Sequence, residues 1–508
     1  MTPPAAAAVA RAAPRPGLVR MVMENVEAFA IAIVMALILK YFLIEAYKIP
    51  TGSMQPEIMG DPTTGIFDRV LVNKLVYLLR DPRRYEVVVF KNPLWQRQNY
   101  IKRLVGFPNE RLELRNGDLF VTQPGGTEAI ARKPDEVWRA VRKDLLPRGN
   151  GGVDLERRFQ TRGGDARVSK ERIAVRGTEP ATIRTREAIR DHYLDGYDRE
   201  WIAAYENPSS PYTPALSFAR LASNDVSDVE IAADVTPASD AKSIAFEIQE
   251  SGRTHRAEFP IGSGSGSLTS TTLNDLDPGE WEDPKSDASL PALRPGVATR
   301  VSLRNVDDEL VVEIDGDVVL RRAYRTRGLD PDADPRTRAL LSTSAAIVAS
   351  GPCTIDELGL WRDIHYLPDG DPHGARSAVY TVPDGEYMVL GDNTQNSWDC
   401  RQWKRATYEF VDGRRIDGNW FNASFAPHAP AGTNTDSNPF VVGSSIHFRS
   451  VFGEEYVFPR TVLRDAPEDP VKIESVNSFR KEFLLGKALA VFWPLPPVSP
   501  TWRLKWVR

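Results

Sequence analysis

The sequence of 508 residues has few cysteines and histidines and no excess of positive charge. Its two cysteines, Cys353 and Cys400, exclude a scaffold held together by several disulfides, and they leave open one bridge or two free thiols. The six histidines show no HExxH or similar spacing, so we expect neither a metal site nor a cofactor. The net charge of −5 excludes the basic surface that binding to nucleic acid requires.

Long apolar runs are also scarce, and the longest lies near the N-terminus. Every residue from Ala28 to Leu39 is apolar. With its flanks the run approaches the roughly 20 residues that a membrane-spanning helix needs, so we predict a transmembrane anchor at residues 26–46. Arginines precede it before any acidic residue, which predicts that residues 1–25 form a disordered tail on the cytoplasmic side. A cleaved signal peptide is the alternative, although no small-x-small cleavage site follows.

The rest of the chain alternates short apolar runs with proline and glycine, which predicts a mainly β fold. We expect one catalytic domain in two parts, residues 47–125 and residues 369–508, with a polar loop insertion near 404–440. The strands predicted in this domain are 69–74, 86–90, 100–105, 118–121, 378–382, 387–390 and a terminal strand within 486–495.

Two further segments separate the halves of that domain. Residues 126–205 are highly charged, and we predict a connecting insert with helical stretches. Residues 206–368 return to strands, of which the hairpin around Asp315-Gly316 is the clearest. Their pattern resembles a β-sandwich of the concanavalin or laminin-G type, which would leave room for a ligand of unknown kind.

A serine on a tight turn follows the apolar run closely. The segment reads Ile49-Pro50-Thr51-Gly52-Ser53-Met54-Gln55-Pro56. A glycine before the serine and prolines on both sides favour a turn that exposes the Ser53 hydroxyl. Such a serine alone is more often an ordinary loop residue.

A lysine on a predicted strand is the second candidate. In Tyr100-Ile101-Lys102-Arg103-Leu104-Val105-Gly106, alternation places Lys102 on the same face as the apolar Tyr100 and Leu104. Burial disfavours the charged form of an amine, so such a lysine can act as a base near neutral pH. The alternative is a lysine at a sheet edge whose amine reaches solvent.

A polar run directly after an apolar strand is the third candidate. It reads Gly391-Asp392-Asn393-Thr394-Gln395-Asn396-Ser397-Trp398-Asp399-Cys400-Arg401. Asp399 and Arg401 can pair and hold such a loop rigid. By itself the run is equally consistent with a hydrogen-bonded turn.

Taken together and in this order, the three segments resemble the type I signal peptidase family. That family has an N-terminal anchor, a Ser-Gly-Ser-Met-x-Pro box, a Tyr-x-Lys-Arg-hydrophobic-Gly strand and a Gly-Asp-Asn-x-x-x-Ser-x-Asp-x-Arg box. The resemblance covers residues 26–125 and 376–403 and a short C-terminal stretch. Thr51 stands where serine is commoner in the family, and it keeps the hydroxyl.

The resemblance implies roles for individual residues. Ser53 would be the nucleophile, Lys102 its general base, and Ser397 would orient the lysine amine by a hydrogen bond. The Thr51 hydroxyl and the Ser53 backbone N–H would form the oxyanion hole. The remaining residues would support the loop (Asp399, Arg401, Asp392 and Asn393) or line a substrate pocket (Ile49 and Met54).

The resemblance also implies a function and a location. The chain would be a serine endopeptidase that removes signal peptides from secretory precursor proteins with small residues before the cleavage site. It would be a single-pass protein of the cell (inner) membrane, in contact with membrane lipid, with its catalytic domain on the extracytoplasmic side. The alternative is a surface binding protein that has an inactive protease core and a ligand-binding β-sandwich.

Overall fold

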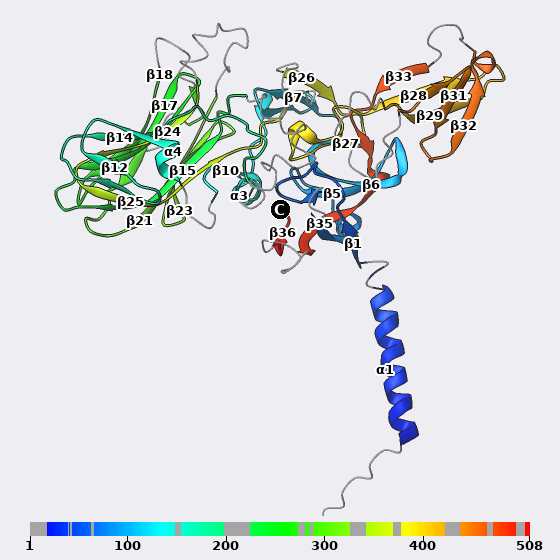
Figure 1. The fold of residues 1–508 in the computed structure, drawn as a ribbon, viewed down its shortest axis with the longest axis horizontal. Coiled ribbons are helices and arrows are strands. Elements are labelled where there is room, and N and C mark those ends of the chain that lie inside the picture. Colours follow the sequence, from blue (N-terminus) through cyan, green and yellow to red (C-terminus); the bar gives the residue numbers. More distant parts are fainter. Residues whose placement is uncertain are drawn as a thin grey trace, which may run out of the picture.

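The structure is a computed structural model. It describes residues 18–38, 40, 43–61, 66–147, 154–197, 224–272, 280–283, 288–325, 342–368, 377–421, 437–464, 471–493 and 503–508. Within these residues the mainly β fold is confirmed, because strands form most of the regular structure. Figure 1 shows a central β body, a large β-sandwich on one side, a small β subdomain on the other, and a projecting helix.

The projecting helix is α1 (Leu18–Ile38), and it differs from the predicted anchor at 26–46. It begins eight positions earlier, and it cannot extend to residue 46 because β1 (Ile44–Lys48) is already a strand of the body. Apolar side chains on α1 are exposed, among them Val26 at 63% and Phe29 at 69%. Among the helices of the described residues, none combines the length and apolar character that crossing a membrane requires.

The body is built from both ends of the chain. Its main sheet has the order β1-β4-β35-β5-β6-β27-β34, and β36 pairs with β35. A second sheet has the order β26-β7-β8-β9, and β2 pairs with β3. The strands are β2 (Gly60–Asp61), β3 (Ile66–Phe67), β4 (Arg69–Asn73), β5 (Val87–Asn92), β6 (Trp95–Gly106), β7 (Arg111–Arg115), β8 (Asp118–Thr122), β9 (Glu128–Ile130), β26 (Ser377–Thr381), β27 (Glu386–Leu390), β34 (Phe479–Arg480), β35 (Leu484–Trp493) and β36 (Lys505–Trp506).

Pairing of β27 with β6 and insertion of β35 between β4 and β5 join the two halves into one unit. The helical elements of the body are the short α2 (Val76–Leu79), η2 (Thr394–Asn396) and η5 (Lys481–Phe483). Each strand predicted for the body has a counterpart, from β4 to β35.

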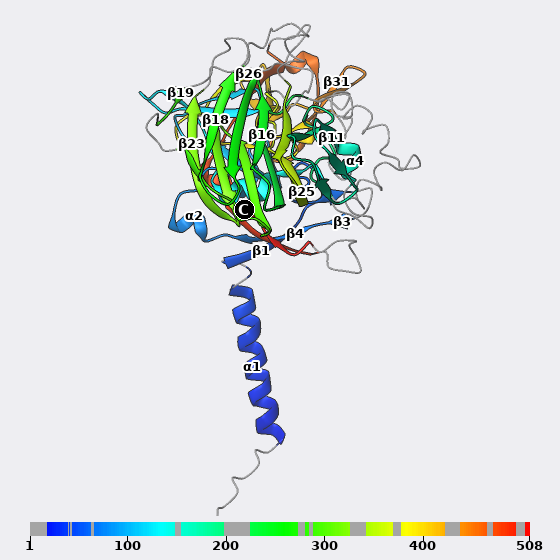
Figure 2. The ribbon, with the colours of Figure 1, turned by 90° about the vertical axis from the view of Figure 1, so that its left-hand side faces the viewer.

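The sandwich consists of two sheets, whose face is turned toward the viewer in Figure 2. One has the order β12-β13-β25-β15-β21-β22-β23-β19, with β10 beside β25, and the other has the order β11-β14-β24-β16-β17-β18-β20. The helix α3 (Asp135–Val141) precedes the sandwich, and its buried Val137 and Val141 belong to the core of the body. The elements of the sandwich are β10 (Lys143–Asp144), α4 (Leu155–Arg158), β11 (Phe159–Arg162), β12 (Ala166–Val168), β13 (Ile173–Val175), β14 (Ala181–Thr185), β15 (Val229–Pro237), β16 (Ser243–Glu250), β17 (Arg253–Pro260), β18 (Ser265–Thr272), β19 (Glu280–Trp281), β20 (Ser289–Pro291), β21 (Thr299–Val306), β22 (Glu309–Ile314), β23 (Asp317–Arg325), β24 (Ser344–Ser350) and β25 (Cys353–Arg362).

The sandwich begins earlier than predicted. Strands between residues 143 and 185 belong to its two sheets, so this part of the predicted insert at 126–205 is not a separate connecting segment. The expected helical stretches are present as α3 and α4. The reason lies in the alternation of each strand: in β14 the side chains of Ala181 and Ile183 enter the core, while Arg184 faces outward. The high charge of the segment therefore marks the outer face of strands. Residues 198–223 lie outside the described residues.

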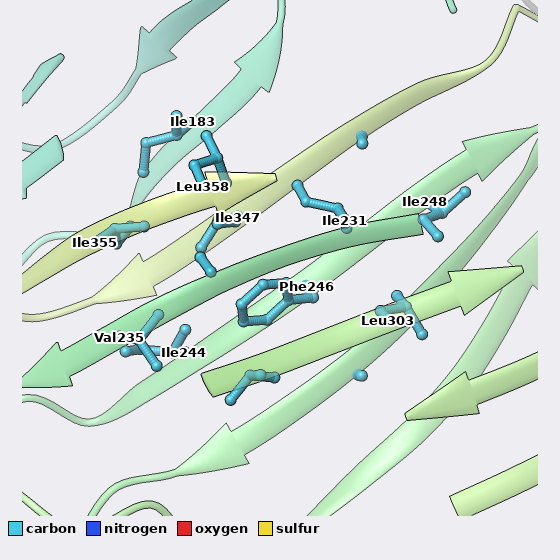
Figure 3. Close-up of a cluster of buried hydrophobic side chains, with 14 of the residues drawn as sticks. Ile183, Ile231, Val235, Ile244, Phe246, Ile248, Leu303, Ile347, Ile355 and Leu358 are labelled. Atoms are coloured by element: carbon cyan, nitrogen blue, oxygen red, sulfur yellow. The ribbon is translucent and has the colours of Figure 1, made fainter. Parts of the chain in front are cut away.

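The core of the sandwich is apolar and continuous between the two sheets. Figure 3 shows Ile231 and Leu303 from one sheet close to Phe246 and Ile347 from the other. Cys353 is buried in this core and Cys400 in the body, and both thiols are free. The question of a disulfide is thereby answered in favour of two free thiols.

The expected polar loop near 404–440 is a folded subdomain instead. Two three-stranded sheets, β29-β28-β33 and β30-β31-β32, enclose a core that includes Tyr408, Phe448 and Phe458. The prediction was wrong because the aromatic residues that form this core come partly from positions beyond 440. Its elements are β28 (Lys404–Glu409), β29 (Arg415–Asn419), β30 (Phe440–Val442), β31 (Ser445–Arg449), β32 (Glu455–Pro459), η4 (Arg460–Val462) and β33 (Val471–Ser475). Residues 422–436 lie outside the described residues.

Candidate active site

The three candidate segments meet at one place in the body. Lys102 lies on β6, which pairs with β27 so that Leu390 faces Arg103. The polar run that begins at Gly391 therefore leaves the sheet beside the lysine. The turn that carries Ser53 follows β1 and contacts the same run, because the Asn393 N–H donates a hydrogen bond to the Ser53 carbonyl at 3.1 Å.

The lysine amine and the serine hydroxyl are in direct contact. Lys102 Nζ donates a hydrogen bond to Ser53 Oγ at 2.6 Å, and a second one to the Ile101 carbonyl at 3.0 Å. Both side chains are buried, with exposures of 6% for Ser53 and 4% for Lys102. This geometry places a potential base on the oxygen of a potential nucleophile.

Burial changes the protonation of this lysine. The pKa of Lys102 falls from the ordinary 10.5 to about 8, because burial disfavours the ammonium form more than the charges of Asp399 and Asp392 stabilise it. The ring of Tyr100, 5.4 Å from Nζ, is part of its surroundings. At pH 7 roughly one lysine in ten is then neutral, whereas almost none would be at the ordinary pKa.

A second buried lysine shows that the pKa alone does not define the site. Burial also lowers the pKa of Lys143, again to about 8. In the part of the chain that the structure describes, however, Lys143 makes no hydrogen bond to Ser53. The contact at 2.6 Å singles out Lys102.

Thr51 lies beside the serine. Its Oγ1 is 3.5 Å from Ser53 Oγ, on the same turn. The Ser53 amide makes no hydrogen bond to another described residue. A hydroxyl and an N–H near one serine are the donors that an oxyanion hole requires.

Charged pairs hold the run after β27 in place. The Arg401 guanidinium donates to both oxygens of Asp399, from Nε at 2.8 Å and from Nη2 at 2.7 Å. Arg103 makes the same two-pronged contact with Asp392, at 2.8 and 2.6 Å. All four side chains are buried, where such pairs constrain geometry strongly. Asn393 adds a side-chain hydrogen bond to the Gly52 carbonyl at 3.1 Å, which ties the serine turn to this run.

The Ser397 hydroxyl has a different hydrogen-bond partner from the one that we expected. Its hydroxyl donates to Asp399 Oδ2 at 2.7 Å, and no hydrogen bond to Lys102 occurs among the described residues. A buried carboxylate is a stronger acceptor than a neighbouring amine, which explains the choice. The expected orienting contact from Ser397 to the lysine is therefore not made in this conformation. Ser397 remains close to the serine turn, since a Cβ added at Gly391 would meet both the Ser397 hydroxyl and the Ser53 carbonyl.

Ile49 and Met54 were expected to line a substrate pocket. Their exposures are 3% and 0%, and both belong to an apolar cluster with Val87 and Ile101. Their contacts in this structure are those of core residues.

A contact from the insert to the serine turn was not predicted from the sequence. Tyr197, which precedes the strands of the sandwich from β15 onward, donates a hydrogen bond to Gln55 Oε1 at 2.7 Å. Gln55 in turn donates to the Gly60 carbonyl at 3.3 Å. Nothing in the motifs around Ser53 or Lys102 could have revealed Tyr197, because its position depends on how the insert packs. Arg103 could have been found, since it follows Lys102 directly and is charged within an apolar strand.

Comparison with known proteins points to one family. The family model of signal peptidase, peptidase S26, matches residues 22–179. The probable signal peptidase I-1 of Synechocystis is 32% identical over 137 residues, which cover 25% of this chain and 67% of the relative. The chain belongs to the signal peptidase family.

Two further members of this family show how much of the chain is shared. Signal peptidase I of Leptolyngbya laminosa is 32% identical over 27% of this chain and 66% of its own. Signal peptidase I of Pseudomonas aeruginosa is also 32% identical, over 25% of this chain and 51% of its own. The chain thus spans about half to two thirds of the length of these curated relatives.

Solved structures resemble this chain only weakly. The carbohydrate binding module CBM66 from Bacillus subtilis aligns with 39% of this chain and 92% of its own, at a TM-score of 0.23 and 8% identity. The galectin LEC-6 of Caenorhabditis elegans aligns with 27% and 82%, at a TM-score of 0.19 and 9% identity. Similarities of this size do not indicate what the sandwich does in this member of the signal peptidase family.

Proposed function

We propose that this protein is a membrane-associated signal peptidase that hydrolyses the peptide bond after the signal sequence of exported precursor proteins. Ser53 is the nucleophile and Lys102 the general base. The observation that carries the proposal is the buried contact of 2.6 Å between Lys102 Nζ and Ser53 Oγ, with an amine whose pKa is lowered to about 8. Membership of the signal peptidase family supports the reaction class.

Acylation follows from this contact. The neutral amine of Lys102 takes the proton of the Ser53 hydroxyl as its oxygen attacks the substrate carbonyl carbon. The negative charge that develops on the carbonyl oxygen is stabilised by the Thr51 hydroxyl and the Ser53 N–H. The carbon–nitrogen bond then breaks, and the proton passes from the lysine to the leaving amine of the mature protein. The signal peptide remains as an ester on Ser53.

Deacylation uses the same two residues. Lys102 takes a proton from a water molecule, which attacks the ester carbon. The carbon–oxygen bond to Ser53 breaks, the serine regains a proton from the lysine, and the signal peptide leaves with a free carboxylate. A histidine is not needed, because a partly neutral lysine performs the proton transfers at the serine.

The supporting residues hold the Ser53 hydroxyl and the Lys102 amine in position relative to each other. The pairs Asp399–Arg401 and Asp392–Arg103 fix the run after β27, and Asn393 connects this run to the serine turn. In this scheme Ser397 donates a hydrogen bond to Asp399. The charge of Asp399 in turn raises the pKa of Lys102. The direct orienting role that the family resemblance implied is replaced by this indirect one.

The site lies close to where a lipid surface is expected. The serine turn follows β1 directly, and α1 precedes β1 in the chain. We propose that the exposed apolar side chains of α1, including Val26, Phe29 and Ile33, contact membrane lipid and keep the catalytic body on the extracytoplasmic side. A precursor whose signal sequence is still in lipid would then present its cleavage site near Ser53. Small side chains before that site are the substrate feature expected from the family.

The test uses the purified full-length chain in detergent and one precursor with an Ala-x-Ala cleavage site. We expect cleavage by the unaltered protein, and loss of at least a thousandfold in kcat/KM for Ser53→Ala and for Lys102→Ala. In the unaltered protein, kcat/KM should rise with pH and level off above about 8, because the base must be neutral.

Lys91→Ala provides the matched control. Lys91 lies on β5 in the same sheet, and its side chain is exposed, so its loss should leave cleavage unchanged. Normal cleavage by Lys102→Ala would refute the assignment of the base. No cleavage by the folded, unaltered protein would refute the function and would favour a binding protein with an inactive core.

A further inference from the structure

Four aspartates gather where the sandwich meets the catalytic body. The first residue of β15 pairs with residues at the C-terminal ends of β21 and β25. These ends of the three strands therefore lie side by side in their sheet. Asp228 precedes β15, Asp307 follows β21 and Asp363 follows β25. Asp118, the first residue of β8, adds a fourth carboxylate from the body. The cluster therefore combines residues from two separately folded parts of the chain.

The carboxylate oxygens are close enough to share an ion. One oxygen each from Asp118, Asp228 and Asp307 lie within 4.8 Å of one another. Calcium binds carboxylate oxygens at about 2.3–2.6 Å, so two of its ligands lie at most roughly 5 Å apart. All three ligands are carboxylate oxygens, which hard divalent cations prefer, and no nitrogen or sulfur ligand belongs to this set.

The charges of the cluster are not balanced by its neighbours. Lys133 Nζ contacts Asp307 at 2.7 Å and Asp363 at 2.6 Å, and among the described residues no ion pair reaches Asp118 or Asp228. The nearby Arg132 guanidinium is directed to the Asp307 backbone carbonyl and to Glu282.

One oxygen of Asp363, at the margin of the cluster, also points to a cation. Asp363 is 1% exposed, and within the part of the chain that the structure describes its Oδ1 has no hydrogen-bond partner. Its other oxygen contacts the same ammonium as Asp307, so Asp363 lies beside the cluster. An unpartnered buried carboxylate oxygen is costly, and a bound cation would remove that cost.

We propose that Asp118, Asp228 and Asp307 bind one calcium ion, with Asp363 at its margin, and that the ion fastens the sandwich to the catalytic body. The inference does not rest on the proposed peptidase activity, because none of these aspartates belongs to the proposed catalytic machinery. It departs from the expectation, drawn from the sequence, that the protein has no metal site. The four residues are separated by more than fifty positions each, so no short spacing in the sequence could reveal them.

The test measures calcium binding by the full-length chain in detergent after treatment with a chelator. Titration with calcium chloride in a calorimeter should show one saturable site. Asp118→Asn should weaken the affinity at least tenfold, because it removes one charged ligand. This variant keeps the shape of the side chain, and the Asp118 side chain makes no hydrogen bond among the described residues, so the fold should persist. Calcium should also raise the melting temperature of the unaltered protein by more than that of the variant.

Asp240→Asn is the control, since Asp240 is an exposed aspartate of the same sandwich, in the turn between β15 and β16. It should bind calcium as the unaltered protein does. Asp228→Asn serves as a second variant, because its amide oxygen can still accept the hydrogen bond from the Asp307 N–H. The proposal is overturned if the folded protein binds no calcium saturably, or if both cluster variants bind it as tightly as the control.

Discussion

Replacing Lys102 by methionine should stabilise the folded protein at neutral pH while it abolishes cleavage. Methionine has a similar length and no charge, so it fills the buried site without the need to remove an ammonium from water. In the unaltered protein the folded state holds this lysine at a pKa of about 8, whereas the unfolded chain holds it near 10.5. Folding at pH 7 must therefore oppose the preference of the amine to be protonated.

The size of the effect follows from the two pKa values. A fall from 10.5 to about 8 corresponds to a cost of about 3 kcal/mol at pH 7, which the methionine variant avoids. The variant also loses the hydrogen bonds to Ser53 and to the Ile101 carbonyl, each worth about 1 kcal/mol. A net gain of about 1 kcal/mol is expected.

The dependence on pH separates these contributions. Between pH 8 and pH 10.5 the unfolded chain binds more protons at this lysine than the folded one, so the unaltered protein becomes more stable as the pH rises. The contribution of the two lost hydrogen bonds to stability does not vary with pH in this way. The advantage of the variant should shrink by about 2–3 kcal/mol from pH 7 to pH 10 and change sign.

Denaturant unfolding of both proteins in detergent, at several pH values, measures this difference. Lys91→Met, which alters an exposed lysine in the same sheet, should show no such trend. A stability difference between Lys102→Met and the unaltered protein that stays constant from pH 7 to pH 10 would refute a lowered lysine pKa, and with it the physical basis of the proposed base.

Two further predictions concern the serine turn. Thr51→Val should lower kcat on the Ala-x-Ala precursor by about 10²–10³-fold with little change in KM, because it removes one donor to the developing oxyanion. Thr51→Ser should retain most of the activity, and equal rates for the two variants would contradict the role. Tyr197→Phe should destabilise the folded protein by about 1–3 kcal/mol, because the buried Gln55 oxygen loses its donor. Denaturant unfolding measures this loss, and an unchanged midpoint would mean that the insert does not support the turn.

The mainly β fold could be predicted because its signals are local. Alternation of apolar and polar residues, broken by proline and glycine, located strands such as β4 and β27 within a few residues. The same local signals were misleading in the insert, where we took the high charge of a segment to mean that its side chains contribute to no core. In β14 the charged Arg184 lies on the outer face of a strand whose other face is buried. The subdomain after β28 was missed because its aromatic core is assembled from strands distant in the sequence.

The sequence by itself determined which side chains are available for chemistry, and in which order: a serine on a proline-flanked turn, a lysine on an apolar strand and a polar run after another strand. These are properties of short segments, so they can be read without coordinates. Only the tertiary structure decided that Lys102 reaches Ser53 across 49 positions, that Ser397 binds Asp399, and that Tyr197 supports the turn. Such contacts, and the lowered pKa that burial produces, depend on pairing between distant strands such as β6 and β27. No local pattern in the chain encodes that pairing by itself.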